Sequence, residues 1–211
     1  MRRTKEDAQL TRERLLDAAE LLFASRGVSG TSLQDIATEA GLTRGALYWH
    51  FKDKGELFNA MMRRSTLPLE EALQRAQDSA SAQPLADVRK NLLYTMSRVV
   101  NDPQTRRVFD IATQKIEYIN EMTAAKDRHL QAIGNKRRFI ESAIKRARAL
   151  GQVGPAVSPK TASIGLLALM NGLLNIWMLD PEQFNLQTAA AKSIDTYLAG
   201  LSAGASAASP A

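Results

Sequence analysis

The sequence predicts an all-α protein. Apolar residues recur at three- and four-residue spacing along most of the chain, and no segment shows the strict alternation of a half-buried strand. Helix-start signals recur with this pattern, since Asp102-Pro103 and Ser158-Pro159 each place a capping side chain before a proline suited to the first helical turn. The 211 residues, 45% of them hydrophobic, can form a small domain and a larger one. We expect about nine helices in total.

Residues 1–9 are charged and lack an apolar rhythm, which predicts a flexible basic arm rather than a signal peptide. Arg2, Arg3 and Lys5 either contact DNA phosphates or the minor groove, or only keep the terminus soluble. Apolar residues between Leu10 and Ser25 then form one helical stripe. This helix is expected to close over the two that follow.

Two short helices joined by a tight turn are predicted over residues 32–51. Thr31 with Gln34 three residues later has the pattern of a reciprocal N-terminal cap. Gly41 suits the left-handed residue that ends a helix, and Thr43 can cap the next one. The order of helix, short turn and helix is that of a DNA-binding helix-turn-helix motif.

The second helix of this motif has an unusual outer face. Ala46, Leu47 and Phe51 can face inward, which leaves hydrogen-bond donors, flat rings and a glycine outside: Thr43, Arg44, Gly45, Tyr48, Trp49 and His50. Such a face suits contact with DNA, because donors can meet phosphates and the glycine permits close approach. The alternative is that Tyr48 and Trp49 seal a small core.

The remaining chain is predicted to be helical. Asp53 and Glu56 form a capping pair that opens a connecting helix, with Lys54 at an end that attracts phosphate and Pro68 as an interruption or kink. Further helices are expected over residues 84–100, 105–115, 120–150, 159–179 and 186–201. We expect the chain to be divided into an arm (1–9), a DNA-binding domain (10–66), a C-terminal domain (67–201) and a disordered tail (202–211).

The segment 164–179 is apolar nearly all round. It is shorter than the ~20 residues of a membrane span and contains Asn171 and Asn175, so we expect no membrane helix. A soluble helix of this kind is buried on two sides. One side can pack on its own domain and the other on a second subunit, with Gly165 and Gly172 allowing close approach.

Composition argues against an enzyme. The chain has no cysteine, which fits a reducing cytoplasm, and its two histidines, His50 and His129, lie far apart. No catalytic motif or metal-ligand cluster is visible, so we expect no cofactor and no metal. The net charge of +6 favours a polyanionic partner, yet residues 126–148 hold eight basic and two acidic residues, for which a solvated helix face is the default interpretation.

The stretch Thr31–Phe51, followed by Asp53-Lys54-Gly55-Glu56-Leu57, resembles the DNA-binding domain of the TetR family of transcriptional repressors. The opening residues 2–9, the run 43–51 and Thr105-Arg106-Arg107 resemble more narrowly the AcrR- and TtgR-like branch, which represses multidrug efflux pumps. The resemblance implies a homodimer formed through the last two helices, a palindromic operator, and a C-terminal domain that binds a hydrophobic small-molecule effector.

The outer face of the second helix and the family resemblance together predict the site residues. Thr31, Ser32, Tyr48, Lys54 and His50 are expected to contact phosphates, and Thr43, Arg44, Gly45 and Trp49 to lie against base edges. The apolar residues that could line an effector pocket, or simply form core, are Leu92, Leu93, Met96, Phe109, Thr113, Ile133, Phe139, Ile140, Ala143, Leu167, Met170, Asn171 and Leu174. Arg137 and Arg138 could pair with an acidic effector or be solvated.

Together these features predict a ligand-responsive repressor. Two rivals stay open. One is a helical small-molecule binding protein with an incidental helix-turn-helix, and the other is a non-specific DNA binder without an effector, which would show a steep salt dependence.

Overall fold

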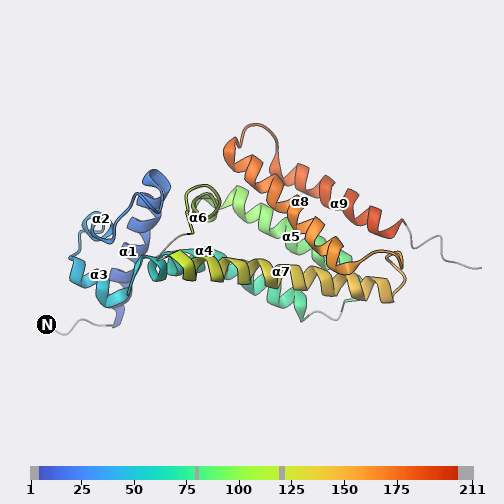
Figure 1. Ribbon diagram of the computed structural model, residues 1–211, viewed down its shortest axis with the longest axis horizontal. Coiled ribbons are helices and arrows are strands. Elements are labelled where there is room, and N and C mark those ends of the chain that lie inside the picture. The colour runs from blue at the N-terminus through green and yellow to red at the C-terminus, as the bar shows by residue number, and fades with distance from the viewer. Residues whose placement is uncertain (1–4, 79–80, 119–121, 204–211) are drawn as a thin grey trace, which may run out of the picture. The chain divides into compact units, whose positions relative to one another are not determined.

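The structure is a computed structural model that describes residues 5–78, 81–118 and 122–203. Within these residues it contains nine helices and no strand, which confirms the all-α prediction (Figure 1). The helices are α1 (Lys5–Arg26), α2 (Leu33–Glu39), α3 (Arg44–His50), α4 (Lys54–Gln77), α5 (Pro84–Asn101), α6 (Pro103–Gln114), α7 (Thr123–Ala149), α8 (Pro159–Leu179) and α9 (Leu186–Ser202).

The chain forms two compact units. The first comprises residues up to Leu67 with Pro103–Gln131, and the second comprises Pro68–Asp102 with residues from Ala132 on. The boundary in α4 lies between Leu67 and Pro68, but the helix is continuous through this proline. Pro68 therefore does not interrupt α4, although it removes one backbone donor.

The core of the first unit lies between α1, α2, α3, α4 and α6. Its fully buried side chains include Leu15, Ile36, Leu47 and Leu57, and the rings of Phe23 and Phe58 lie 6.1 Å apart. Helix α1 packs on α2, α3 and α6, as expected for a helix that closes over the motif. This packing fixes which face of α3 is available to a partner.

Two local predictions are wrong in detail. Helix α1 begins at Lys5, so residues 5–9 are helical rather than a flexible arm; Glu6 and Asp7 lie in the first turn, where negative charge stabilises a helix. Arg2 and Arg3 lie outside the described residues, as do residues 204–211 of the predicted tail. Ser202 still belongs to α9.

The cap of α2 is shifted by one residue. Ser32, not Thr31, is the N-cap: its hydroxyl accepts from Asp35 N at 3.1 Å, and Asp35 Oδ2 accepts from Ser32 N at 2.9 Å. The Ser32 hydroxyl also donates to Asp35 Oδ2 at 2.6 Å, and this bond, with the one from Ser32 N, holds the pKa of Asp35 below its ordinary value. The predicted cap of α3 by Thr43 is confirmed, as is the left-handed Gly41, with φ +64°.

In the second unit, α9 packs against both α5 and α8. Tyr197 of α9 donates from its hydroxyl to the carbonyl of Ala162 at 2.9 Å. A Cβ on Gly165 would lie only 2.4 Å from this hydroxyl oxygen, so Gly165 serves packing within the chain. A Cβ on Gly172 would meet nothing within 4 Å.

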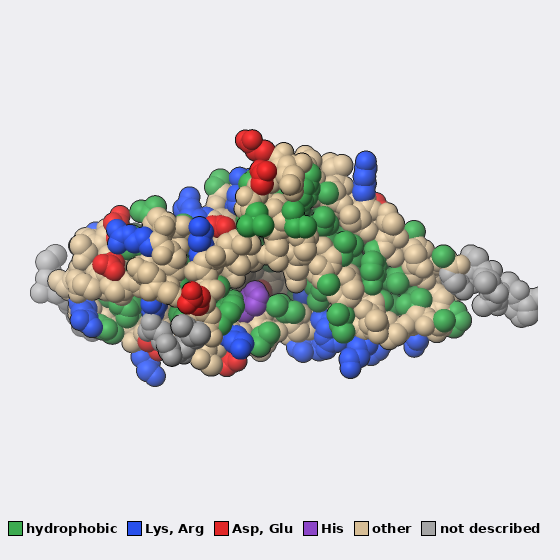
Figure 2. Space-filling model, turned by 45° about the horizontal axis from the view of Figure 1, so that its top comes forward, with side chains coloured by type: hydrophobic (Ala, Val, Ile, Leu, Met, Phe, Trp, Pro, Cys, Tyr) green, Lys and Arg blue, Asp and Glu red, His purple; other side chains and the backbone are tan. Residues whose placement is uncertain are grey.

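Helix α8 is the one described helix long and apolar enough to cross a membrane, and 39% of its most apolar window is buried in the protein. Core helices of soluble proteins have the same length and composition. Large apolar side chains remain exposed on α8, namely Ile164, Ile176 and Leu179. Figure 2 shows hydrophobic side chains gathered over the surface that α8 and α9 form.

Candidate nucleic-acid interface

Helix α3 is held by its inner face and presents its outer face to solvent. Leu47 is fully buried and Phe51 is 1% exposed, so both anchor α3 in the core. Arg14 of α1 donates to the carbonyl of Ala40 at 2.5 Å, which fixes the turn that leads into α3. The helix is therefore a rigid platform for the residues on its other side.

The two aromatic residues of α3 do not seal a core. Trp49 is 71% exposed and Tyr48 is 45% exposed. The Trp49 ring meets the partly buried His50 ring edge-on, with centroids 4.5 Å apart. Adjacent exposed aromatic side chains on a well-packed helix indicate a surface that binds a partner.

Arg44 and Tyr48 orient each other. The guanidinium of Arg44 donates to Tyr48 Oη at 3.2 Å, and its central carbon lies 5.3 Å from the ring centroid. The two residues are four apart and thus lie on one face of α3. This arrangement presents a cation and a hydroxyl side by side.

A hollow of about 470 Å³ opens beside α3, lined by Ser29–Asp35, Arg44, Tyr48 and Lys54. Lys54 Nζ donates to the carbonyls of Val28 and Thr31 at 3.1 Å each, which holds the ammonium at the edge of this hollow. Ser32 is exposed there, whereas Thr31 is 1% exposed and its hydroxyl donates to Gly27 O at 2.8 Å. Thr31 thus supports the loop from inside, and a phosphate contact through its side chain is not favoured by this geometry.

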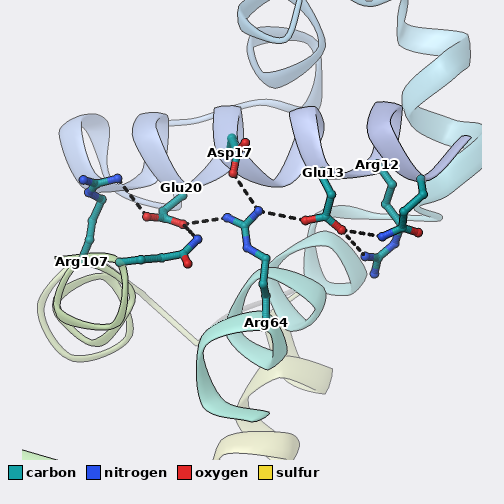
Figure 3. A network of polar contacts seen from close by, with 8 residues as sticks. Arg12, Glu13, Asp17, Glu20, Arg64 and Arg107 are labelled. Carbon is teal, nitrogen blue, oxygen red and sulfur yellow. Dashed lines mark hydrogen bonds and ion pairs between the residues drawn. The ribbon is translucent and has the colours of Figure 1, made fainter. Parts of the chain in front are cut away.

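An ion-pair network that the sequence analysis missed locks α1 against α4 and α6 (Figure 3). Arg64 of α4 contacts three carboxylates of α1: Glu13 at 3.1 Å, Asp17 at 2.7 Å and Glu20 at 2.9 Å. Arg107 of α6 also contacts Glu20, at 2.9 Å. Burial opposes the charge of Arg64, but its carboxylate partners outweigh burial and raise the pKa of Arg64.

In the described residues no group of three or more histidine, cysteine or acidic side chains is arranged to hold a metal ion. The features of the first unit are instead a rigid, exposed helix with donors and aromatic rings. Comparison with known proteins agrees with this interpretation. Residues 15–61 match the family model of bacterial regulatory proteins of the tetR family, and residues 83–203 match the C-terminal region of MAATS-type transcriptional repressors.

The chain belongs to the TetR family. Like other members of this non-enzymatic family, it is a DNA-binding transcriptional regulator. It is 37% identical to the regulator TtgR of Pseudomonas putida over 94% of each chain. It is 32% identical to AcrR of Shigella flexneri, over 90% of this chain and 88% of AcrR.

Solved structures of TetR-family repressors are also similar. NalD, the secondary repressor of the MexAB-OprM multidrug efflux pump in Pseudomonas aeruginosa, matches with a TM-score of 0.86 and 35% identity, over 94% of this chain and 99% of NalD. SmeT of Stenotrophomonas maltophilia, in complex with triclosan, matches with a TM-score of 0.82 and 32% identity, over 93% of this chain and 94% of SmeT. This TetR-family chain is thus related to multidrug efflux pump repressors along nearly its whole length.

The candidate effector residues of this TetR-family chain do not all share one environment. Those of the second unit that are buried are Leu92, Met96, Phe139, Ile140, Ala143, Leu167, Met170 and Leu174. Leu93 and Ile133 are partly buried, and Asn171 is exposed. Phe109 and Thr113 belong to the first unit, where Thr113 is exposed and its hydroxyl donates to Phe109 O.

Proposed function

We propose that this regulator is a dimeric repressor of a multidrug efflux operon, acting in the cytoplasm, and that small molecules release it from a palindromic operator. The observation that carries the proposal is the outer face of α3, with its exposed Trp49 and paired Arg44 and Tyr48. Similarity to TtgR, AcrR and NalD over nearly the whole chain supports the efflux assignment.

The outer-face residues of α3 and its cap each have a proposed role at the operator. Arg44, Gly45 and Trp49, with the cap Thr43, lie against base edges in the major groove. Tyr48, with Ser32 and Lys54 around the neighbouring hollow, binds phosphate, and His50 does so near the helix end. Thr31 was expected to bind phosphate too, but its buried hydroxyl supports the loop instead.

The dimer would form through α8 and α9. Two reading helices must lie about 34 Å apart to enter successive major grooves, so a stable pair of subunits is needed. The exposed Ile164, Ile176 and Leu179 on α8 support this assignment, and Gly172 leaves room for close approach. The effector would bind the second unit in the state that cannot bind DNA, and its preference for that state limits the extent of release.

The proposal is tested by fluorescence anisotropy of the purified chain on labelled DNA from upstream of its own gene, against scrambled DNA at physiological salt. Tight binding to the upstream DNA, reversed by apolar compounds such as triclosan, is the expected result. Equal affinity for both DNAs with a steep salt dependence would favour the non-specific binder instead.

Gly45 provides a test in which stability and DNA binding move in opposite directions. A Cβ at this position would meet only Thr43 Oγ1, at 3.9 Å, so nothing within the chain requires glycine. Gly45→Ala is expected to stabilise α3 by up to about 1 kcal/mol, because alanine is the better helix former. It should weaken operator binding about tenfold if the backbone approaches DNA closely there.

Urea unfolding and the anisotropy assay measure these two effects on the same sample. A variant that gains stability and keeps full operator affinity would remove Gly45 from the interface. Gly134→Ala is the matched control, since Gly134 also lies in a helix, in the stretch of α7 that belongs to the second unit.

A further inference from the structure

Lys136 reaches from α7 to a buried hydroxyl on α5. Its Nζ donates to Oγ1 of Thr95 at 2.8 Å, and Thr95 is only 7% exposed. Other basic residues of this part of α7 behave differently, since Arg137 and Lys145 both pair with Glu141 at 2.8 Å. The basic run 126–148 is therefore not uniformly a solvated face.

Among the described residues, the charge of Lys136 has no counter-ion. In the described part of the chain no carboxylate lies within 4.0 Å of its Nζ. Two acidic residues of this unit pair with arginines instead. Asp102, which ends α5, pairs with Arg98, and Asp195 of α9 pairs with Arg89. Asp87 lies on the same face of α5 as Thr95 but two turns earlier, so positions 87 and 95 are about 12 Å apart along the helix axis. Loss of hydration lowers the pKa of Lys136 to about 8.

Asn91 adds an unused acceptor one turn from the Thr95 partner of this cation. It lies one turn before Thr95 on α5, hence on the same face, and is 6% exposed. Its Oδ1 is buried and has no hydrogen-bond partner among the described residues. A buried amide oxygen without a donor and a desolvated ammonium without an anion are both unfavourable in an otherwise apolar interior.

Buried apolar residues lie within one turn of Thr95 and of Lys136 along their own helices. Leu92 and Met96 of α5 are 1% and 3% exposed, and Phe139 and Ile140 of α7 are 3% and 0% exposed. Apolar side chains with a few convergent polar groups are typical of a site for a small organic molecule. A complementary ligand would place an anionic group at Lys136 and a hydrogen-bond donor at Asn91.

We propose that Lys136 is the counter-ion of the effector's acid group, so that the second unit binds amphipathic organic anions. The carboxylate accepts from Lys136 and Thr95, and the apolar body lies along α5 and α7, with any hydroxyl donating to Asn91 Oδ1. This assignment rests on the proposed effector-released repressor and narrows its effector class. A charge-assisted hydrogen bond in a desolvated site favours the acid over a neutral analogue by about tenfold or more.

Isothermal titration calorimetry on the full chain, without DNA, tests the assignment with acids and their neutral amides. The probes are 2-naphthoate with 2-naphthamide, and decanoate with decanamide, at pH 7. The wild-type protein is expected to bind each acid at least about tenfold more tightly than its amide. In Lys136→Met the acids should lose at least tenfold in affinity, while the amides change less than about threefold.

Lys145→Met is the matched control, because it removes the same charge from an exposed position of the same helix. It should leave the preference for acids unchanged. Circular dichroism verifies that both variants are folded; if Lys136→Met is not, Thr95→Val is used, which keeps the lysine but removes its partner and should reduce the preference. Equal binding of acid and amide by the wild type, a preference that survives Lys136→Met, or no binding of any probe would overturn the assignment.

Operator binding is measured separately by anisotropy. A protein that binds its operator but does not discriminate acid from amide contradicts only the role of Lys136. A protein that prefers the acids through Lys136 but ignores operator sequence contradicts only the repressor proposal.

Discussion

Replacing Arg64 by alanine is expected to destabilise the protein by about 2–4 kcal/mol, because it leaves a buried carboxylate short of its main counter-ion. Glu20 is 2% exposed and accepts from Arg64, Arg107 and Gln104. Arg64→Ala also removes the contacts of Arg64 with Glu13 and Asp17. The remaining donors keep part of the charge on Glu20 compensated, which sets the upper end of the range.

Urea unfolding followed by circular dichroism, at one fixed protein concentration, measures this loss. Arg63→Ala is the control, since Arg63 is an exposed neighbour on the same helix and should change the stability by less than about 0.5 kcal/mol. Arg64→Lys should lie between the two, because an ammonium keeps the charge but loses the guanidinium fork. If Arg64→Ala were no less stable than Arg63→Ala, the network would not hold α1 in place.

Local signals explain why the helices could be predicted so closely. Ser158-Pro159 and Asn185 mark the starts of α8 and α9, and Gly41 marks the turn before α3. The cap of α2 was misplaced because Thr31 and Ser32 are equally suitable by residue type. Packing decides between them, since the Thr31 hydroxyl is drawn into the loop by Gly27 O.

Long-range pairs could not be predicted in the same way. Arg64 and Glu20 are 44 residues apart, and no local pattern joins them. The one available signal was Glu20 beside the apolar stripe of α1, because a carboxylate that is buried there requires a partner. Lys136 was hidden for the opposite reason: it lies in a basic run that suggests solvent, and only the fold reveals that its ammonium meets Thr95.

Tyr48→Ala is expected to weaken operator binding by about 30- to 100-fold with little change in stability. Tyr48 is 45% exposed, so the core should not depend on it, whereas the neighbouring Leu47 is fully buried. The change removes a proposed phosphate donor together with the surface against which Arg44 stacks. A phosphate contact and a base-reading arginine would thus be weakened together, which accounts for an effect of about 2–3 kcal/mol.

A double-mutant cycle of Arg44→Ala and Tyr48→Ala separates the contributions of the two residues to operator affinity, which is measured by anisotropy. If Tyr48 acts largely by orienting Arg44, the double variant should lose much less than the product of the two single losses. Tyr48→Phe keeps the ring and should retain most of the stacking while losing the hydroxyl contact. An unfolded Tyr48→Ala protein, or one with wild-type affinity, would contradict the assignment of α3 as the reading helix, because Tyr48 would then belong to the core or to a surface that DNA does not touch.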